Sequence, residues 1–430
     1  MIYIVLLLGL LVRLISLNQS LWLDEATTAL VSKMPIVDFF TKFMPADFHP
    51  PLYYLVISYW SLVVGHTEIA LRIPSVIFGV LTVYVVYLVA KEIKFKKPLY
   101  PALMLATSGL HIYYSQEARM YGMVTWLVSC LVLSYLRRKW VMFSILLCLI
   151  FLTDYLSILI VPALLVYVLI YDRQSVKRFL YSLAPLFVTF VVWLPTFANQ
   201  IGQGLAVKSS QSEWWNILGP VTFKNIALIP AKFIIGRVSL DDKSLYAVLI
   251  AVLVAIFGYS IMKAKNKLLW SWFGVSILLG IAVSFYVPTL TYFRYLFVLP
   301  AFYLLISENI SKKLFYSVLI INIVTSGAYL FLPKFHRENW RSAANIIGSE
   351  RIVFPVNSQK EGLTYYGKAS QIISKEQLTK EDNKIWLSRY VWDIFDPTDL
   401  TRKYIEDLGY NKVTEVNLNG VILYKYENRN

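Results

Sequence analysis

Charged residues are scarce in this sequence. Asp, Glu, Lys and Arg make up 16% of the 430 residues, whereas 57% are hydrophobic. A soluble globular domain carries about 25% charged residues, so the composition excludes that class. It predicts instead an all-α polytopic protein of the lipid bilayer, in which apolar helices cross the membrane.

Cysteines and acidic residues are also few. Cys130 and Cys148 both lie inside apolar runs, so we expect neither a disulfide nor a metal-binding pair. The 41 basic residues outnumber the 26 acidic ones, but they fall largely in short clusters between apolar runs. Cytoplasmic loops orient membrane helices in this way, so the net charge of +15 does not indicate a nucleic-acid partner.

Internal repeats and low-complexity tracts are missing as well, which argues against an inverted-repeat transporter. The first apolar run, residues 2–17, lacks both a basic leader and a small-residue cleavage site. We therefore expect this run to remain in the protein as a membrane anchor.

The apolar runs predict a transmembrane catalytic domain over residues 1–332. About eleven crossings are expected, and the loops assigned to the cytoplasm are all basic, as the positive-inside rule requires. After the first span, the expected crossings are 69–90, 98–113, 119–136, 140–153, 155–171, 179–198, 244–262, 268–287, 294–309 and 313–332.

The segment Pro51 to Gly65 decides the topology. If it crossed the membrane, Glu117 would lie on the side opposite to Asp24. If it lies along the interface, Asp24, His49 and Glu117 meet on one side. We favour an interfacial helix within the outer loop 18–67, because about 15 residues that begin with two prolines and carry several aromatic side chains suit the interface better than a crossing.

Two further regions lie outside the spans. Residues 199–242, with Trp214 and Trp215, are expected to form an outer loop close to the interface. Residues 333–430 are mostly polar and predict a small soluble α/β domain on the outer face, with strands near 351–356, 384–387 and 421–426 and a helix near 398–408.

The strongest candidate site follows the first span, where Asp24 and Glu25 stand side by side. A carboxylate crowded by another carboxylate and partly desolvated has a raised pKa, which suits the removal of a proton from a hydroxyl. The alternative is an ordinary helix start, in which Asp24 caps the run that begins at Ala26.

Other polar residues fall on the same side in the favoured topology. Arginines there would suit a phosphate, because the guanidinium group matches its oxygens and stays charged. Each also has a structural alternative. Arg72 could lie at the interface, His49 could end a loop, and the tyrosines could belong to the aromatic belt. Glu117 and Arg119 could form a surface ion pair, and Asp154 could mark a turn. The candidates are His49, Tyr53, Arg72, Glu117, Arg119, Tyr121, Asp154 and Arg294.

Six motifs along residues 1–330 resemble one known family. They are Trp-x-Asp-Glu at 22–25, His-Pro-Pro-Leu-Tyr-Tyr at 49–54, Leu-Arg-Ile-Pro-Ser at 71–75, Tyr-Ser-Gln-Glu-Ala-Arg-Met-Tyr at 114–121, Trp-Leu-Pro at 193–195 and Arg-Tyr-Leu at 294–296. In this order they resemble the GT-C glycosyltransferases of the dolichyl-phosphate-mannose protein mannosyltransferase type.

The resemblance implies an inverting membrane enzyme that takes a sugar from a polyprenyl-phosphate donor on the outer face. It implies that Asp24, with Glu25 beside it, is the base for the acceptor, that Glu117 is a second acid and that Arg294 contacts the donor phosphate. The eukaryotic members usually place an aspartate a few residues further along, where this chain has Tyr121 and Gly122. The acceptor, which is a lipid, a glycan or a protein, is left open.

Two rival functions remain at this stage. A transporter or flippase of lipid-linked saccharides needs ionisable residues in the middle of its spans, whereas here nearly all lie at the outer ends. A glycan ligase or polymerase would share the outer site. No cofactor is certain; paired carboxylates are able to bind a divalent metal, but the sequence shows no convincing ligand set.

Overall fold

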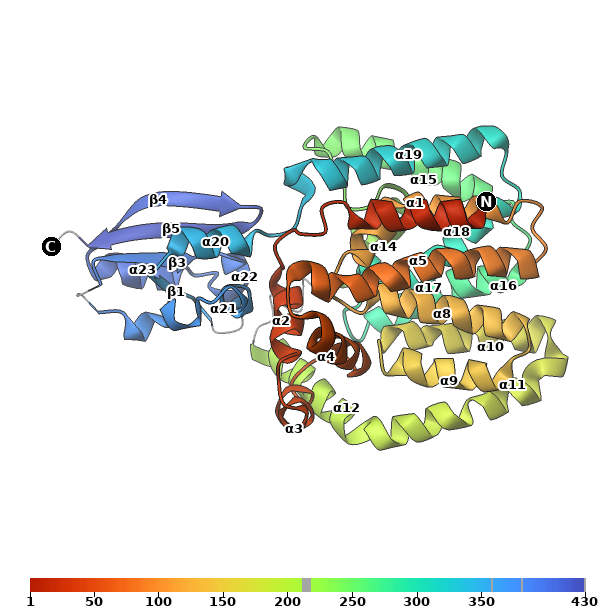
Figure 1. The fold of residues 1–430 in the computed structure, drawn as a ribbon, viewed down its shortest axis with the longest axis horizontal. Coiled ribbons are helices and arrows are strands. Elements are labelled where there is room, and N and C mark those ends of the chain that lie inside the picture. The colour runs from red at the N-terminus through yellow and green to blue at the C-terminus, as the bar shows by residue number, and fades with distance from the viewer. Residues whose placement is uncertain (211–217, 357–358, 380–381, 429–430) are drawn as a thin grey trace.

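A computed structural model describes residues 1–210, 218–356, 359–379 and 382–428. It shows a large helical bundle and, at one end of it, a small α/β domain built from the C-terminal residues (Figure 1). The last bundle helix, α19, ends at Phe331, and the chain then leaves the bundle.

Helices form wherever the sequence predicts a span. A helix satisfies its own backbone hydrogen bonds, which is required in hydrocarbon. The bundle contains α1 (Ile2–Leu14), α5 (Glu68–Glu92), α6 (Leu99–Thr107), α7 (Gly109–Ser115), α8 (Tyr121–Leu136), α9 (Trp140–Phe151), η2 (Leu156–Leu159), α10 (Ile160–Tyr171), η3 (Arg173–Ser175), α11 (Val176–Ser182), α12 (Ala184–Ser210), α14 (Phe223–Ile235), α15 (Lys243–Met262), α16 (Lys267–Trp270), η4 (Ser271–Val275), α17 (Ser276–Ser284), η5 (Tyr292–Val298), α18 (Leu299–Glu308) and α19 (Lys312–Phe331).

Five continuous helical stretches are long and apolar enough to cross a bilayer, within the residues described: 68–92, 173–206, 243–262, 267–284 and 312–331. Shorter apolar helices fill several of the other expected positions. The chain is a multi-pass membrane protein by this measure, and the number of about eleven crossings stays a prediction.

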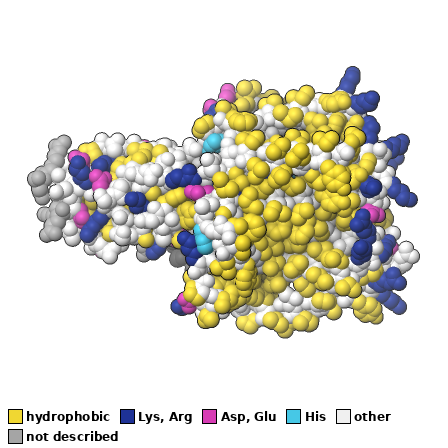
Figure 2. Space-filling view, in the orientation of Figure 1, with side chains coloured by type: hydrophobic (Ala, Val, Ile, Leu, Met, Phe, Trp, Pro, Cys, Tyr) yellow, Lys and Arg dark blue, Asp and Glu magenta, His cyan; other side chains and the backbone are white. Residues whose placement is uncertain are grey.

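The surface of the bundle is divided along its long axis. A broad hydrophobic belt covers the face shown in Figure 2, and Lys and Arg gather at the end opposite the C-terminal domain. Some of the basic loops contact each other there: Arg137 after α8 pairs with Glu92 of α5 at 2.6 Å. A belt of this kind suits lipid contact, and the basic end suits the cytoplasm.

The expected interfacial segment forms α4 (Leu52–Val64), which is too short to span the bilayer. It lies with α2 (Leu23–Val31) at the end of the bundle that faces the C-terminal domain (Figure 1). Arg119 contacts both Asp24 and His49. These segments therefore meet at one end of the bundle, as the favoured topology requires, and the interfacial position of α4 stays a prediction. The loop also contains α3 (Ile36–Asp38) and η1 (Phe39–Phe43).

The expected loop at 199–242 is partly wrong. Helix α12 continues to Ser210, and residues 223–235 form α14 with Thr222 as its side-chain N-cap. The two glycines at 202 and 204 did not interrupt α12, because an isolated glycine costs a helix only about 1 kcal/mol. Trp214 and Trp215 lie outside the described residues.

The C-terminal domain is a five-stranded sheet in the order β2-β1-β3-β5-β4. Strands β2, β1 and β3 are parallel, and β3, β5 and β4 are antiparallel. The predicted strands and helix are confirmed, but β4 was missed because Lys412 and Glu415 make this edge strand look like a loop. The elements are α20 (Trp340–Ile347), β1 (Arg351–Val353), α21 (Glu361–Tyr365), β2 (Ile372–Ile373), β3 (Lys384–Ser388), α22 (Trp392–Phe395), α23 (Leu400–Asp407), β4 (Tyr410–Leu418) and β5 (Val421–Asn428), with short 3-10 turns at 333–335, 369–371 and 375–377.

The two parts of the chain are joined through α2 and its flanking residues. Leu23 packs against the hydrophobic core of the C-terminal domain. The Tyr366 hydroxyl accepts from the backbone N–H of Leu21 at 2.9 Å and donates to Glu68, which also accepts from Arg341 at 2.7 Å. The C-terminal domain therefore holds the segment that carries the paired acids.

Close packing of α20 against α21 gives a test of this domain. A Cβ added at Gly362 would lie 2.6 Å from the buried Trp340 ring, which is too short for any real contact. Gly362→Ala should therefore destabilise the domain by about 1–3 kcal/mol. Thermal unfolding of the purified full chain measures this, with Gly258→Ala as the control because nothing lies within 4 Å of its added methyl group. Equal midpoints for both variants would contradict the packing.

Candidate functional site

The arginine of α5 organises the outer end of the bundle. Arg72 is fully buried, and each of its five N–H groups donates within the protein. The acceptors are the carbonyl oxygens of Leu17, Gln19 and Ser20 and both carboxylate oxygens of Glu25, at 2.5 to 3.0 Å. Arg72 was expected either at the interface or on a phosphate; in this structure it has no donor left for a phosphate.

Glu25 is the anionic partner of this arginine. Besides Arg72, its Oε1 accepts from the backbone N–H of Ala118 at 2.8 Å and its Oε2 lies 3.7 Å from Arg337. Burial alone would raise the pKa of this carboxyl, but Arg72 and then Arg337 hold it below its usual value. Glu25 is thus an ionised anchor that ties α2 to α5 and to the loop before α8. The expectation that it works beside Asp24 at the reacting atoms is not what the geometry shows.

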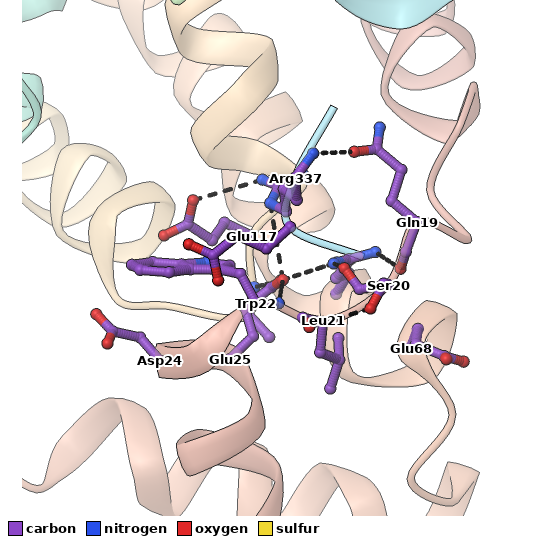
Figure 3. A network of polar contacts seen from close by, with 12 residues as sticks. Gln19, Ser20, Leu21, Trp22, Asp24, Glu25, Glu68, Glu117 and Arg337 are labelled. Atoms are coloured by element: carbon purple, nitrogen blue, oxygen red, sulfur yellow. Dashed lines mark hydrogen bonds and ion pairs between the residues drawn. The ribbon is translucent and has the colours of Figure 1, made fainter. Parts of the chain in front are cut away.

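Asp24 has a different environment from its neighbour. Its side chain is 38% exposed, against 0% for Glu25, and its Oδ2 lies 3.3 Å from Nη2 of Arg119. In Figure 3 it extends away from the network around Arg337, whereas Glu25 lies inside it. Adjacent residues on a helix point in different directions, which separates the two acids. Asp24 is the member of the pair that a substrate can reach.

Arg119 connects Asp24 to the histidine of the outer loop. Its Nη2 lies 3.2 Å from Nε2 of His49, and Nδ1 of His49 lies 3.6 Å from Asp47. Burial would raise the pKa of Asp47, but His49 and Arg119 hold it below its usual value. The loop residue His49 is therefore fixed between a cation and an anion, beside Asp24, as its predicted place in the site requires.

Glu117 is the second acid expected from the sequence. It is buried in the turn between α7 and α8, its Oε2 lies 3.4 Å from Arg337, and its Oε1 has no hydrogen-bond partner. Burial raises the pKa of this carboxyl to about 7. Arg337 opposes this rise, and the negative charge of Glu25 adds to it. It does not form the surface pair with Arg119 that its position also allowed.

Arg337 was missed from the sequence because it follows the last span and belongs to the segment assigned to the soluble domain. It is buried between Glu25 and Glu117, and its guanidinium lies over the Tyr113 ring at 4.2 Å. Figure 3 shows it at the centre of the polar network. Its position shortly after α19 was the one sequence feature that could have indicated a place in the site.

Arg237, between α14 and α15, was missed as well. It lies 4.7 Å from the centre of the Tyr113 ring and donates to the Tyr292 hydroxyl at 3.1 Å. Arg294, which was predicted, donates to the Pro288 carbonyl at 3.2 Å. Within the described residues, no carboxylate lies within 4.0 Å of either guanidinium. A lone cation at the end of an apolar helix in an outer loop was a usable signal for Arg237.

Aromatic rings fill the space between these charges. Tyr121 packs edge-to-face on Phe293 at 5.5 Å and on Tyr114 at 5.2 Å. Tyr121 therefore packs beside Phe293, the residue before Arg294, and its role as a substrate contact stays a prediction.

Two of the predicted residues have structural partners. The Tyr53 hydroxyl is buried against the hydroxyl of Ser75 at 2.8 Å, rather than in an interfacial belt. Asp154 accepts from the backbone N–H of Ser157 at 2.9 Å and so begins η2, which confirms the turn alternative. Neither side chain has a hydrogen bond to Asp24 or Glu117 in the described structure.

No cluster of three or more His, Cys, Asp or Glu side chains suited to a metal ion occurs in the part of the chain that the structure describes. A cavity of about 490 Å³ lies in the C-terminal domain, lined by residues that include Lys360, Thr364 and Gln377. It contains none of the predicted site residues.

Comparisons with known proteins support the motif analysis. Residues 48–198 match the family model described as dolichyl-phosphate-mannose-protein mannosyltransferase. No curated protein matches the chain in sequence. Among solved structures, ArnT from Cupriavidus metallidurans bound to undecaprenyl phosphate has a TM-score of 0.58 at 12% identity, over 98% of this chain and 96% of that one.

Two further structures are similar over the whole chain at lower scores. ArnT from the same organism in the apo state has a TM-score of 0.46 at 14% identity, over 98% of this chain and 97% of that one. The Archaeoglobus fulgidus oligosaccharyltransferase has a TM-score of 0.49 at 12% identity, over 100% of this chain and 74% of that one. The family-model match over residues 48–198 and the ArnT-like fold agree with the resemblance inferred from the motifs: the chain is similar to GT-C glycosyltransferases of the ArnT and protein mannosyltransferase type.

Proposed function

We propose that this protein transfers a sugar, a hexose such as mannose, from a polyprenyl-phosphate donor to a lipid, glycan or protein acceptor on the extracytoplasmic face of the cell membrane. The observation that carries the proposal is an accessible acid at the same end of the bundle as two cations that have no carboxylate partner among the described residues. Asp24 is reachable and lies 3.3 Å from Arg119, whereas Arg237 and Arg294 donate only to a hydroxyl and to a carbonyl oxygen in the described structure.

The proposed reaction is a single displacement with inversion. The Asp24 carboxylate takes the proton of the acceptor hydroxyl, and the oxygen of that hydroxyl attacks the anomeric carbon of the donor sugar. The bond between that carbon and the phosphate oxygen breaks, and the polyprenyl phosphate leaves with the electron pair. Arg294 and Arg237 stabilise its added negative charge, because their guanidinium groups have no carboxylate partner among the described residues.

A lipid-linked donor suits the location of the site. The residues meet at the end of the bundle, beside the short helix α4 and beyond the hydrophobic belt (Figures 1 and 2). A polyprenyl phosphate keeps its charged head at the membrane surface and its tail in hydrocarbon. ArnT, whose fold is similar, has been solved with undecaprenyl phosphate bound. The basic loops at the opposite end favour an extracytoplasmic site.

A transporter of lipid-linked saccharides is the alternative that one feature favours. Arg13 is buried inside the bundle and contacts His111 at 2.7 Å. However, Arg13 lies in the last turn of α1 and also donates to the carbonyl oxygens of Gly9, one turn earlier, and of Ala106, in the last turn of α6. The negative ends of two helix dipoles stabilise a cation there, so the break between α6 and α7 explains this arginine without transport.

The base is tested with Asp24→Asn. Loss of a general base should lower turnover by about 10²- to 10⁴-fold. Purified protein is given undecaprenyl-phosphate mannose or glucose with candidate acceptors, and the release of undecaprenyl phosphate is measured. Asp38→Asn is the control, because Asp38 is an exposed acid of the same outer loop that pairs only with Lys42 in the described structure. Unchanged turnover in Asp24→Asn, or transport without turnover in the parent protein, contradicts the proposal.

The phosphate contacts are tested with Arg237→Gln. A hydrogen bond to a charged group contributes about 1.5–3 kcal/mol, so affinity for undecaprenyl phosphate should fall about 10- to 100-fold. Binding is measured by titrating undecaprenyl phosphate into the full chain in lipid nanodiscs. Lys224→Gln removes an exposed cation from the neighbouring α14 and should bind as the parent does. Equal affinity of both variants would remove Arg237 from the site.

A further inference from the structure

The segment after the last bundle helix supplies a buried charge to the site. Arg337 lies between α19 and α20, yet only 5% of it is exposed. Its Nη1 donates to the Tyr329 hydroxyl and its Nη2 to the Tyr113 carbonyl, both at 2.9 Å. Its own backbone N–H donates to Gln19. This residue therefore reaches from the C-terminal segment into the bundle and is held there at several points.

Arg337 faces both buried acids, but only one of them depends on it. Glu25 has two strong hydrogen bonds from Arg72 and one from Ala118. Within the described residues, the Glu117 side chain has one hydrogen bond, from Nη2 of Arg337 at 3.4 Å, and its Oε1 has no partner. A buried carboxylate is ionised only if a cation compensates for lost hydration. For Glu117 the nearest such cation is Arg337.

The same arginine also contacts the ring that supports Arg237. The Tyr113 ring lies 4.2 Å from the Arg337 guanidinium and 4.7 Å from that of Arg237. Arg337 is neutralised by two acids, whereas Arg237 has no carboxylate within 4.0 Å among the described residues. Tyr113 therefore connects the acid pair to the cation that we assign to the donor phosphate.

We propose that Arg337 is a positioning residue of the transferase site: it favours the charged form of Glu117 through their contact at 3.4 Å and holds Tyr113 in place beneath Arg237. This inference rests on the proposed function. It also gives the C-terminal segment a role, because docking of the α/β domain then completes the site. Substrate chemistry stays with Asp24, Arg237 and Arg294.

The test is the titration of Glu117 in the full chain, which requires no substrate. Infrared spectroscopy detects the C=O band of a protonated carboxyl, and subtraction of the Glu117→Gln spectrum isolates this residue. In the parent protein the midpoint is expected at about 7, because burial and Glu25 raise the pKa of Glu117 and Arg337 lowers it only in part. Removing the positive charge favours the neutral acid, so Arg337→Gln should shift the midpoint upward by about one to three pH units.

Other charged and titratable groups face Glu117 and could mask the effect, so each is left unchanged in the variants. They are Glu25, Tyr53, Tyr113, Tyr114, Arg119, Tyr121 and Arg237. The matched control is Arg341→Gln. Arg341 belongs to the same segment and joins the C-terminal domain to the bundle through Glu68, but it does not contact Glu117. A shift of the Glu117 midpoint in Arg341→Gln would therefore measure the effect of weakening the contact between the domain and the bundle alone.

Three outcomes decide the inference. An upward shift in Arg337→Gln, with no shift in Arg341→Gln and a smaller shift in Arg337→Lys, supports it. Equal shifts in the Gln variants, or none, overturn it. If Arg337→Gln does not fold, Arg337→Lys still decides. A midpoint raised by less than one pH unit with tenfold weaker undecaprenyl phosphate binding supports the inference, because lysine keeps the charge but not the contact with Tyr113, and parent-like binding overturns it. Failure of sugar transfer by the parent protein would instead overturn the proposed function and leave the titration result standing.

Discussion

The buried ion pair between Arg72 and Glu25 is the interaction on which the outer end of the protein depends. It fixes the carbonyl groups after α1, the start of α2 and the loop before α8 at a single point. Removing one partner of such a pair leaves an uncompensated buried charge and costs about 3–5 kcal/mol. Because three separate segments meet here, Asp24, Arg119 and Glu117 are positioned together and not one by one.

The cations at the two ends of the bundle differ in burial and in their ion-pair partners. Cations at the basic end lie in exposed loops, where the membrane potential and anionic lipids orient them. Cations at the other end are buried and paired, as with Arg72 and Arg337, or have no acid near them in the described structure, as with Arg237 and Arg294. Arg237 is exposed and Arg294 is half-buried, so both guanidinium groups are accessible to an anion. A departing phosphate would supply one.

The sequence predicted the helices well, because hydropathy reports transfer into lipid directly. It also placed Asp24, His49 and Arg119 on one side, since a 13-residue α4 cannot span a bilayer. It did not predict Arg337, because pairing across more than 200 residues depends on packing that no local pattern records. Arg237 was missed although its place after an apolar helix was a usable signal. Arg72 was misjudged for the same reason: its acceptors are mostly backbone carbonyl groups of a distant loop.

The sequence did not predict that the two adjacent acids differ in exposure. Asp24 and Glu25 are both carboxylates at the start of the same helix, and the family resemblance names only Asp24 as the base. On α2 their side chains diverge, so one enters the bundle and the other stays accessible. A carboxylate with every oxygen engaged by arginine is a poor base, because protonation would break those bonds. Glu25 is therefore suited to hold the site together, and Asp24, restrained by a single guanidinium contact, is free to accept a proton.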